Sequence, residues 1–247
     1  MARTLSPYRY KDGFKDGIPI GLGYLSVSFG LGITAVSMGI KAFEALLISM
    51  TNMTSAGEMA GMVIIAAGGT ILEMILTQFV INLRYALMGI SLTQRLDSRC
   101  STPHRLLMSF GMTDEIFALA ASKPYAVGPS YFYGLMTCPY LGWSLGTLGG
   151  ALAGQILPTD LQSALGIMIY AMFIAIILPP ARKSRVIAGL VSVSMAASGL
   201  LTWLCGRFGW TGFTEGFRII LLTVTISLAA ALLFPVKEEA EEKEVTA

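Results

Sequence analysis

The sequence has few charged residues. Only 13% of its 247 residues are Asp, Glu, Lys or Arg, whereas 54% are hydrophobic. A soluble domain contains about 25% charged residues. Of the charges present, six fall within the first 16 residues and seven between Lys237 and Glu244. A soluble globular domain is therefore excluded. We expect an all-α, polytopic membrane protein with one transmembrane domain over residues 1–236 and an acidic cytoplasmic tail over residues 237–247.

Residues typical of metal sites and catalysis are also scarce. The chain has one histidine and three widely separated cysteines, which give neither a metal-ligand spacing nor a disulfide framework. It contains no P-loop and no dinucleotide-binding fingerprint. The net charge of +2 is too small to suggest nucleic-acid binding. Because no nucleophile and base occur together either, we expect no metal, no cofactor and no enzymatic activity.

Six segments are long and apolar enough to cross a bilayer, which takes about 20 residues. They are Ile18–Gly39, Thr70–Leu92, Pro129–Ala153, Ser163–Leu178, Val186–Leu204 and Phe217–Phe234. Two further apolar segments, Phe43–Gly68 and Leu106–Ser122, are interrupted by polar residues. The first contains the polar run Thr51–Ser55, and the second contains Asp114 and Glu115.

The positions of lysine and arginine indicate how these segments cross. Cytoplasmic loops are enriched in both residues. The N-terminal segment, Thr93–Arg105 and Pro179–Arg185 are basic, whereas Gly154–Gln162 has no basic residue. The basic loops share one side only if neither interrupted segment crosses. The prediction is therefore six full spans plus two broken or re-entrant segments, with both termini cytoplasmic; seven or eight full spans are the alternative.

Five ionisable residues are candidates for a position at membrane depth, where each costs roughly 2.5 to 3.5 kcal/mol at a helix centre. They are Glu58, Glu73, Arg84, Asp114 and Glu115. Arg84 needs a buried partner, and Glu73 is about 16 Å away along the same helix. We therefore expect Asp114 or Glu115 to pair with Arg84. An ion pair that serves only packing is the alternative interpretation.

The polar run before Glu58 predicts a break in a helix. Hydroxyl and small residues can satisfy the backbone groups that a break frees. Broken helices of this kind form the substrate sites of many carriers. Glu58 would then bind a substrate ammonium group or carry a proton. The alternative is an ordinary kinked helix with Gly57 and Gly61 in a packing seam.

The candidate site combines these residues. The substrate-binding candidates are Thr54, Ser55, Gly57, Glu58, Asn82, Arg84, Tyr85 and Thr113. The candidates for proton coupling or an ion pair are Glu58, Glu73, Asp114 and Glu115.

Glycines at intervals of four in one span predict close helix packing. They are Gly142, Gly146, Gly150 and Gly154. Trp143, in the same span, is interpreted as an anchor at the membrane interface.

Several motifs together resemble one family. They are Ser55-Ala56-Gly57-Glu58-Met59-Ala60-Gly61, Asn82-Leu83-Arg84-Tyr85, Thr113-Asp114-Glu115, Pro139-Tyr140-Leu141-Gly142-Trp143 and Pro179-Pro180-Ala181. The chain resembles the AzlC family, the large subunits of bacterial branched-chain amino-acid exporters. The resemblance implies an inner-membrane carrier that exports valine, leucine and isoleucine, and sometimes methionine, driven by the proton gradient. It also implies a small hydrophobic partner subunit of the AzlD type.

One residue departs from the resemblance. Similar proteins commonly carry glutamine where this chain has Glu58. A carboxyl group there leaves open a different small amino acid or an organic cation as substrate. A structural subunit whose partner forms the transport site is a further alternative.

Overall fold

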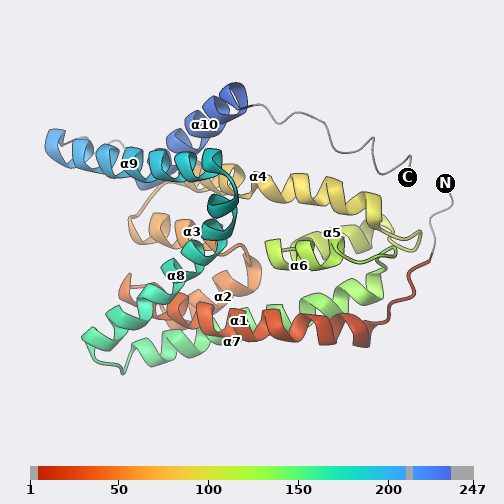
Figure 1. Ribbon diagram of the computed structural model, residues 1–247. Helices are drawn as coiled ribbons and strands as arrows, with labels where there is room; N and C mark the ends of the chain where they lie inside the picture. The colour runs from red at the N-terminus through yellow and green to blue at the C-terminus, as the bar shows by residue number, and fades with distance from the viewer. Residues whose placement is uncertain (1–4, 210–213, 235–247) are drawn as a thin grey trace. The chain divides into compact units, whose positions relative to one another are not determined.

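The computed structural model describes residues 5–209 and 214–234, so the predicted acidic tail lies outside the described residues. Within these ranges the chain is helical and forms no β-strand, which confirms the all-α prediction (Figure 1). The helices are α1 (Tyr10–Ser37), α2 (Ala42–Thr51), α3 (Ala56–Ala66), α4 (Ile71–Arg95), α5 (Thr102–Phe110), α6 (Asp114–Ala121), α7 (Pro129–Gly154), α8 (Thr159–Lys183), α9 (Arg185–Phe208) and α10 (Glu215–Leu233).

Four helices are long and apolar enough to cross a membrane by length and composition. They are α1, α4, α9 and residues Gly216–Leu233 of α10. The predicted span Pro129–Ala153 is also a continuous helix, α7, but it is rich in glycine and hydroxyl residues. Its side chains are largely buried, because it packs inside the protein instead of facing outward.

The chain divides into two units, Met1–Ile174 and Ala175–Ala247. In the second unit α9 packs on α10, and no described residue of α9 is buried within the protein. Large apolar side chains such as Met195 and Trp203 are exposed. Such a surface is stable in lipid or against another apolar protein, not in water.

The first unit is built on a parallel pair of helices, α1 and α7, whose backbones touch. A Cβ atom added to Gly142 would lie 2.2 Å from the carbonyl oxygen of Gly21, and one added to Gly150 would lie 1.9 Å from that of Phe29. The predicted glycine seam is confirmed at these residues and at Gly146. At Gly154 the approach to α1 is an ordinary contact of 3.4 Å. Only glycine permits backbones this close.

The second interrupted segment forms a helical hairpin. The backbone N–H of Val127 donates to the carbonyl of Arg95 over 2.9 Å, and the N–H of Asp97 donates to the carbonyl of Val127 over 3.0 Å. The intervening chain, which contains α5 and α6, therefore leaves and returns at one point. The helix breaks between them at residues 111–113.

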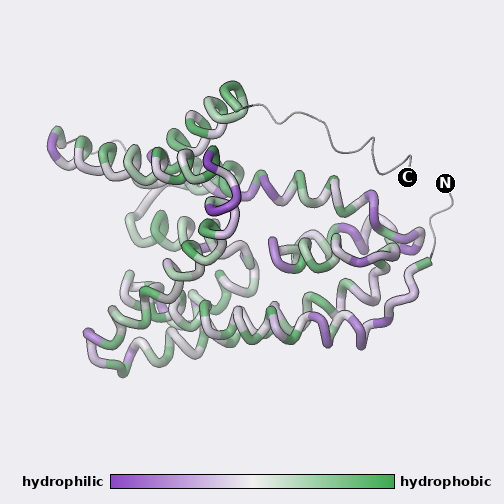
Figure 2. The backbone as a smooth tube through the Cα atoms, in the orientation of Figure 1, coloured by the Kyte–Doolittle hydropathy of each residue, from purple (hydrophilic) through white to green (hydrophobic). Residues whose placement is uncertain are grey.

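The end of α4 meets the chain that precedes α1. The Asp97 carboxylate accepts the backbone N–H of Ser6 over 3.1 Å, and Arg99 donates to the carbonyl of Ser6 over 3.2 Å. Burial raises the pKa of Asp97, but the hydrogen bonds from Arg99 and the backbone outweigh it, so this pKa lies below its ordinary value. Figure 2 shows hydrophilic residues where α1 begins and where α4 ends.

This meeting point fixes the path of the first interrupted segment. Because the chain just before α1 contacts the chain just after α4 and each helix is long enough to cross, the end of α1 and the start of α4 lie at the opposite end. The α2–α3 segment connects these two ends, and its helix breaks at residues 52–55. It is therefore a second hairpin, which enters from the side opposite to α5–α6 (Figure 1). This geometry favours re-entrant segments over full spans.

Cysteine labelling tests this path. In a chain without its three native cysteines, Leu5→Cys and Ser98→Cys should react with a membrane-impermeant maleimide from the same side, because Ser6 and Asp97 are in contact. Ile156→Cys, just past the end of α7 and exposed, is the matched control and should react only from the other side. Labelling of positions 5 and 98 from different sides would overturn the hairpin path of α2–α3.

Candidate functional site

The break between α2 and α3 forms the first tip, residues 52–55. Ser55 precedes α3 with a φ of +50°, and among the described residues it is the one non-glycine residue with positive φ. Such conformations are uncommon and cluster at functional sites. The Thr54 hydroxyl donates to the Asn52 side-chain oxygen over 2.7 Å. The first tip is therefore held by its own polar side chains.

Amide side chains of α4 cover the start of α3. Gln78 donates to the carbonyl of Gly57 over 2.7 Å, and Asn82 donates to the side-chain oxygen of Gln78 over 3.0 Å. A Cβ atom at Gly57 would lie 2.5 Å from the Thr54 hydroxyl and 2.9 Å from the Asn82 oxygen. That Asn82 oxygen is buried without a hydrogen-bond partner in the described part of the chain. It is an acceptor that a ligand donor can satisfy.

Glu58 points away from these amides, toward α2 and α7. It is fully buried. The indole N–H of Trp143 donates to its Oε2 atom over 2.7 Å, and its Oε1 atom is hydrogen-bonded to the Ser49 hydroxyl. That hydroxyl in turn lies 2.7 Å from the hydroxyl of Thr147. Glu58 is therefore enclosed by neutral groups that can donate hydrogen bonds.

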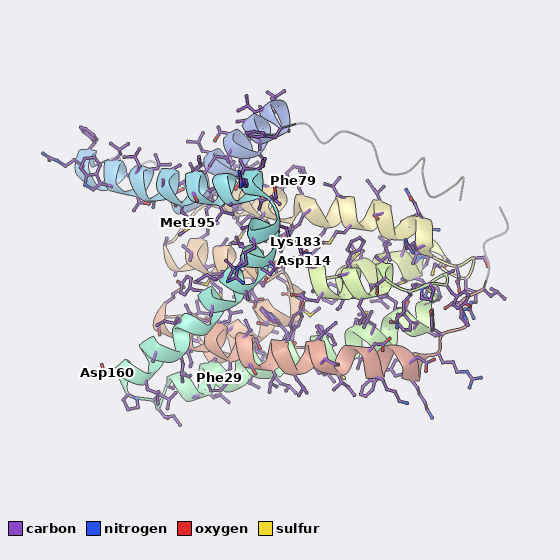
Figure 3. All side chains as sticks on the ribbon, in the orientation of Figure 1. Phe29, Phe79, Asp114, Asp160, Lys183 and Met195 are labelled. Atoms are coloured by element: carbon purple, nitrogen blue, oxygen red, sulfur yellow. The ribbon has the colours of Figure 1, made fainter. Side chains whose placement is uncertain are left out.

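The second tip, residues 111–113, leads into α6. The Thr113 hydroxyl accepts the backbone N–H of Ile116 and caps the helix. Asp114, at the start of α6 (Figure 3), forms an ion pair with Arg84 of α4. Arg84 also donates to the Tyr85 hydroxyl over 3.2 Å. Of the two acids expected to pair with Arg84, the structure therefore selects Asp114.

Glu115 has a different partner. The Tyr24 hydroxyl of α1 is hydrogen-bonded to its carboxylate and lies 2.7 Å from the Thr113 hydroxyl. The Tyr24 ring meets the Trp143 ring edge to face, with ring centroids 5.2 Å apart. These two side chains of the α1–α7 pair therefore connect the acid at the second tip to the acid near the first.

Glu73 does not join the two tips. It lies in the first turn of α4 and is buried, with its carboxylate close to Gly69 in the α3–α4 connection. Gln78, Asn82 and Arg84, which contact the tips, lie further along the same helix. Glu73 is therefore a buried acid that lies apart from the two tips.

Five residues of the site were not among the sequence candidates. They are Tyr24, Ser49, Gln78, Trp143 and Thr147. The interpretation of Trp143 as an interface anchor is wrong, because this residue is 2% exposed and its indole donates to Glu58. The position of Trp143 directly after Gly142, in a glycine seam that must face another helix, was a signal that this residue is buried.

The comparisons with known proteins agree with a membrane location. A family model described as AzlC protein matches residues 19–157, which include both tips and most of the α1–α7 pair. The chain is 27% identical to the inner membrane protein YgaZ of Escherichia coli over 77% of this chain and 81% of that protein. It is 29% identical to an uncharacterized membrane protein of Archaeoglobus fulgidus over 92% of each chain, and 25% identical to one of Helicobacter pylori over 71% and 77%. No solved structure matches this chain.

Proposed function

Since this chain belongs to the AzlC family, we propose that it is the large subunit of a proton-coupled exporter of branched-chain amino acids. In this proposal it lies in the cytoplasmic membrane and works with a small hydrophobic subunit of the AzlD type. The family and the membrane proteins among its relatives support a role in membrane transport. Our proposal adds to this role the identity of the substrate, the coupling to protons and the partner subunit.

The observation that carries the proposal is the pair of hairpins that enter from opposite sides. Their tips bring non-helical backbone and charged side chains into an apolar unit. Such backbone survives at membrane depth only where protein encloses it or where it lines a cavity. In many carriers, broken helices supply the substrate site, with access from each side in turn.

The polar groups at the tips suit a zwitterion with an apolar side chain. Arg84 could receive a substrate carboxylate, while the Glu115 carboxylate and the free Asn82 oxygen could accept from an ammonium group. Thr54, Ser55, Gly57, Tyr85 and Thr113 complete the proposed surface. Binding of the ammonium by Glu58 has less support, because both of its oxygens are already hydrogen-bonded to Trp143 and Ser49.

An efflux assay tests the proposal. Cells that lack the chain are loaded with dipeptides containing valine, leucine or isoleucine, and the internal amino-acid pools are followed over time. Expression of the chain with its small partner should lower these pools severalfold, while pools from an alanine or lysine dipeptide stay unchanged. Equal pools with and without the pair of subunits would contradict the proposal. Lowered pools with the partner alone would assign the site to the partner.

A further inference from the structure

We propose that Glu58 takes up and releases the transported proton. The hydroxyl groups of Ser49 and Thr147 reverse their hydrogen bonds, so that both the neutral and the ionised form of Glu58 are satisfied. That the proton is the transported one rests on the proposed function. The binding of a proton to this carboxyl group rests on the geometry alone.

The surroundings of Glu58 favour a neutral carboxyl group in this conformation. The side chain is fully buried, and none of the ion pairs found among the described residues includes it. The groups that face it are Ser49 of α2 and Trp143 and Thr147 of α7, with Tyr24 of α1 behind the indole. All are uncharged at neutral pH. A buried carboxylate without a cation costs several kcal/mol, so the acid form is favoured here.

The orientation of the Thr147 hydroxyl in this conformation agrees with a neutral Glu58. The Thr147 hydroxyl donates to the backbone carbonyl of Trp143 over 3.0 Å, which uses its proton. The Ser49 hydroxyl can then donate to Thr147 over 2.7 Å, which uses its own. The remaining contact, between Ser49 and Oε1 of Glu58, lacks a proton unless the carboxyl group supplies it.

The same three residues can also serve the ionised form. When Glu58 releases its proton, the Ser49 hydroxyl can turn to donate to the carboxylate, and the Thr147 hydroxyl can donate to Ser49. The Trp143 carbonyl then keeps its bond to a backbone N–H within α7. Trp143 donates to Oε2 in both forms. Each state thus has a complete set of hydrogen bonds, and the two differ by one proton on Glu58.

The acids at the second tip, Asp114 and Glu115, lie in different surroundings. Asp114 is paired with Arg84, a permanent cation that stabilises its charged form. Glu115 shares the Tyr24 hydroxyl with Thr113. Neither of these acids is fully buried, whereas Glu58 is. The geometry therefore assigns the proton to Glu58 and leaves the Arg84–Asp114 pair for the substrate.

Infrared spectroscopy of the purified chain tests proton binding without any transported substrate. Wild-type protein should show the carbonyl band of a protonated carboxylic acid, and this band should disappear when the sample is made alkaline. Glu58→Gln should remove the band, while Glu44→Gln, at an exposed acid in the first turn of α2, should keep it. In Ser49→Ala the band should disappear only at a higher pH, because the ionised form has lost its hydroxyl donor. A band that survives in Glu58→Gln would overturn the proposal.

Transport by reconstituted protein tests whether this proton is coupled. Glu58→Gln keeps an uncharged group of the same shape, so exchange of amino acid for amino acid across the membrane should continue. Accumulation driven by a pH gradient should fall to the level of vesicles without protein. Gradient-driven accumulation equal to that of Glu44→Gln would overturn the coupling. If the wild type moves no amino acid, the proposed function fails, and the infrared result still decides whether Glu58 binds the proton.

Discussion

Arg84→Ala should reduce export about a hundredfold or more, the scale expected when a charged group that positions a substrate is lost. Arg84 pairs with Asp114 at the start of α6 and also donates to Tyr85, so its removal frees the second tip from α4. It also leaves a carboxylate without a cation at a position where the chain is apolar. The measurement is amino-acid efflux from loaded cells, corrected for the amount of protein in the membrane.

Two further variants separate a transport role for Arg84 from a packing role. Arg95→Ala, at the end of the same helix, is the matched control and should leave export nearly unchanged. Arg84→Ala combined with Asp114→Ala removes both charges, so membrane levels should recover while export stays lost. Export restored by the double variant would show that the pair serves packing alone.

The helix breaks at the two tips could be predicted from the sequence because they depend on residues that are neighbours along the chain. The hydroxyl and small residues of the run Thr51–Ser55 predict a break in the first segment, and the adjacent acids Asp114 and Glu115 interrupt the second. The structure breaks the helix at residues 52–55 and 111–113. The same local reasoning indicated that Arg84 needs an acid. It could not select between two neighbouring acids, because Asp114 and Glu115 differ only in which side of the α6 start they face.

The environment of Glu58 could not be predicted in this way. Its partners come from other helices: Ser49 lies nine residues away in sequence, and Trp143 lies 85 residues away. A sequence pattern shows which residue types recur on one helix, but not which face of another helix they meet. Glu58 therefore appeared equally suited to an ammonium group and to a proton until its neighbours were known.

Side-chain length also limits predictions from helix geometry. Arg84 and Tyr85 fall on different halves of α4 when only the angle per residue is counted. In the structure Arg84 donates to the Tyr85 hydroxyl over 3.2 Å, and its guanidinium carbon lies 4.9 Å from the centre of the tyrosine ring. Two long side chains can thus join faces of α4 that the backbone separates.

Gly142→Ala should destabilise the first unit more than any surface substitution does, by about 3 kcal/mol or more if the helices cannot separate. The added Cβ atom would lie 2.2 Å from the carbonyl oxygen of Gly21, a backbone atom that cannot rotate away. Gly23→Ala is the matched control, because a Cβ atom at that α1 position has no neighbour within 4 Å. Alanine favours a helix by up to about 1 kcal/mol over glycine, so this control should be equally or more stable. Thermal unfolding in detergent measures both.

The effect of Gly142→Ala should reach the site as well as the fold. Trp143 follows Gly142 directly, and Thr147 lies on the same helix four residues beyond Trp143. If α7 moves away from α1, the indole leaves Glu58, and its contact with Tyr24 opens. Protein that remains folded should therefore lose gradient-driven transport together with the infrared band of the buried acid. A Gly142→Ala chain as stable and as active as Gly23→Ala would mean that α1 and α7 do not touch along this seam, and that the α1–α7 pair does not position Glu58.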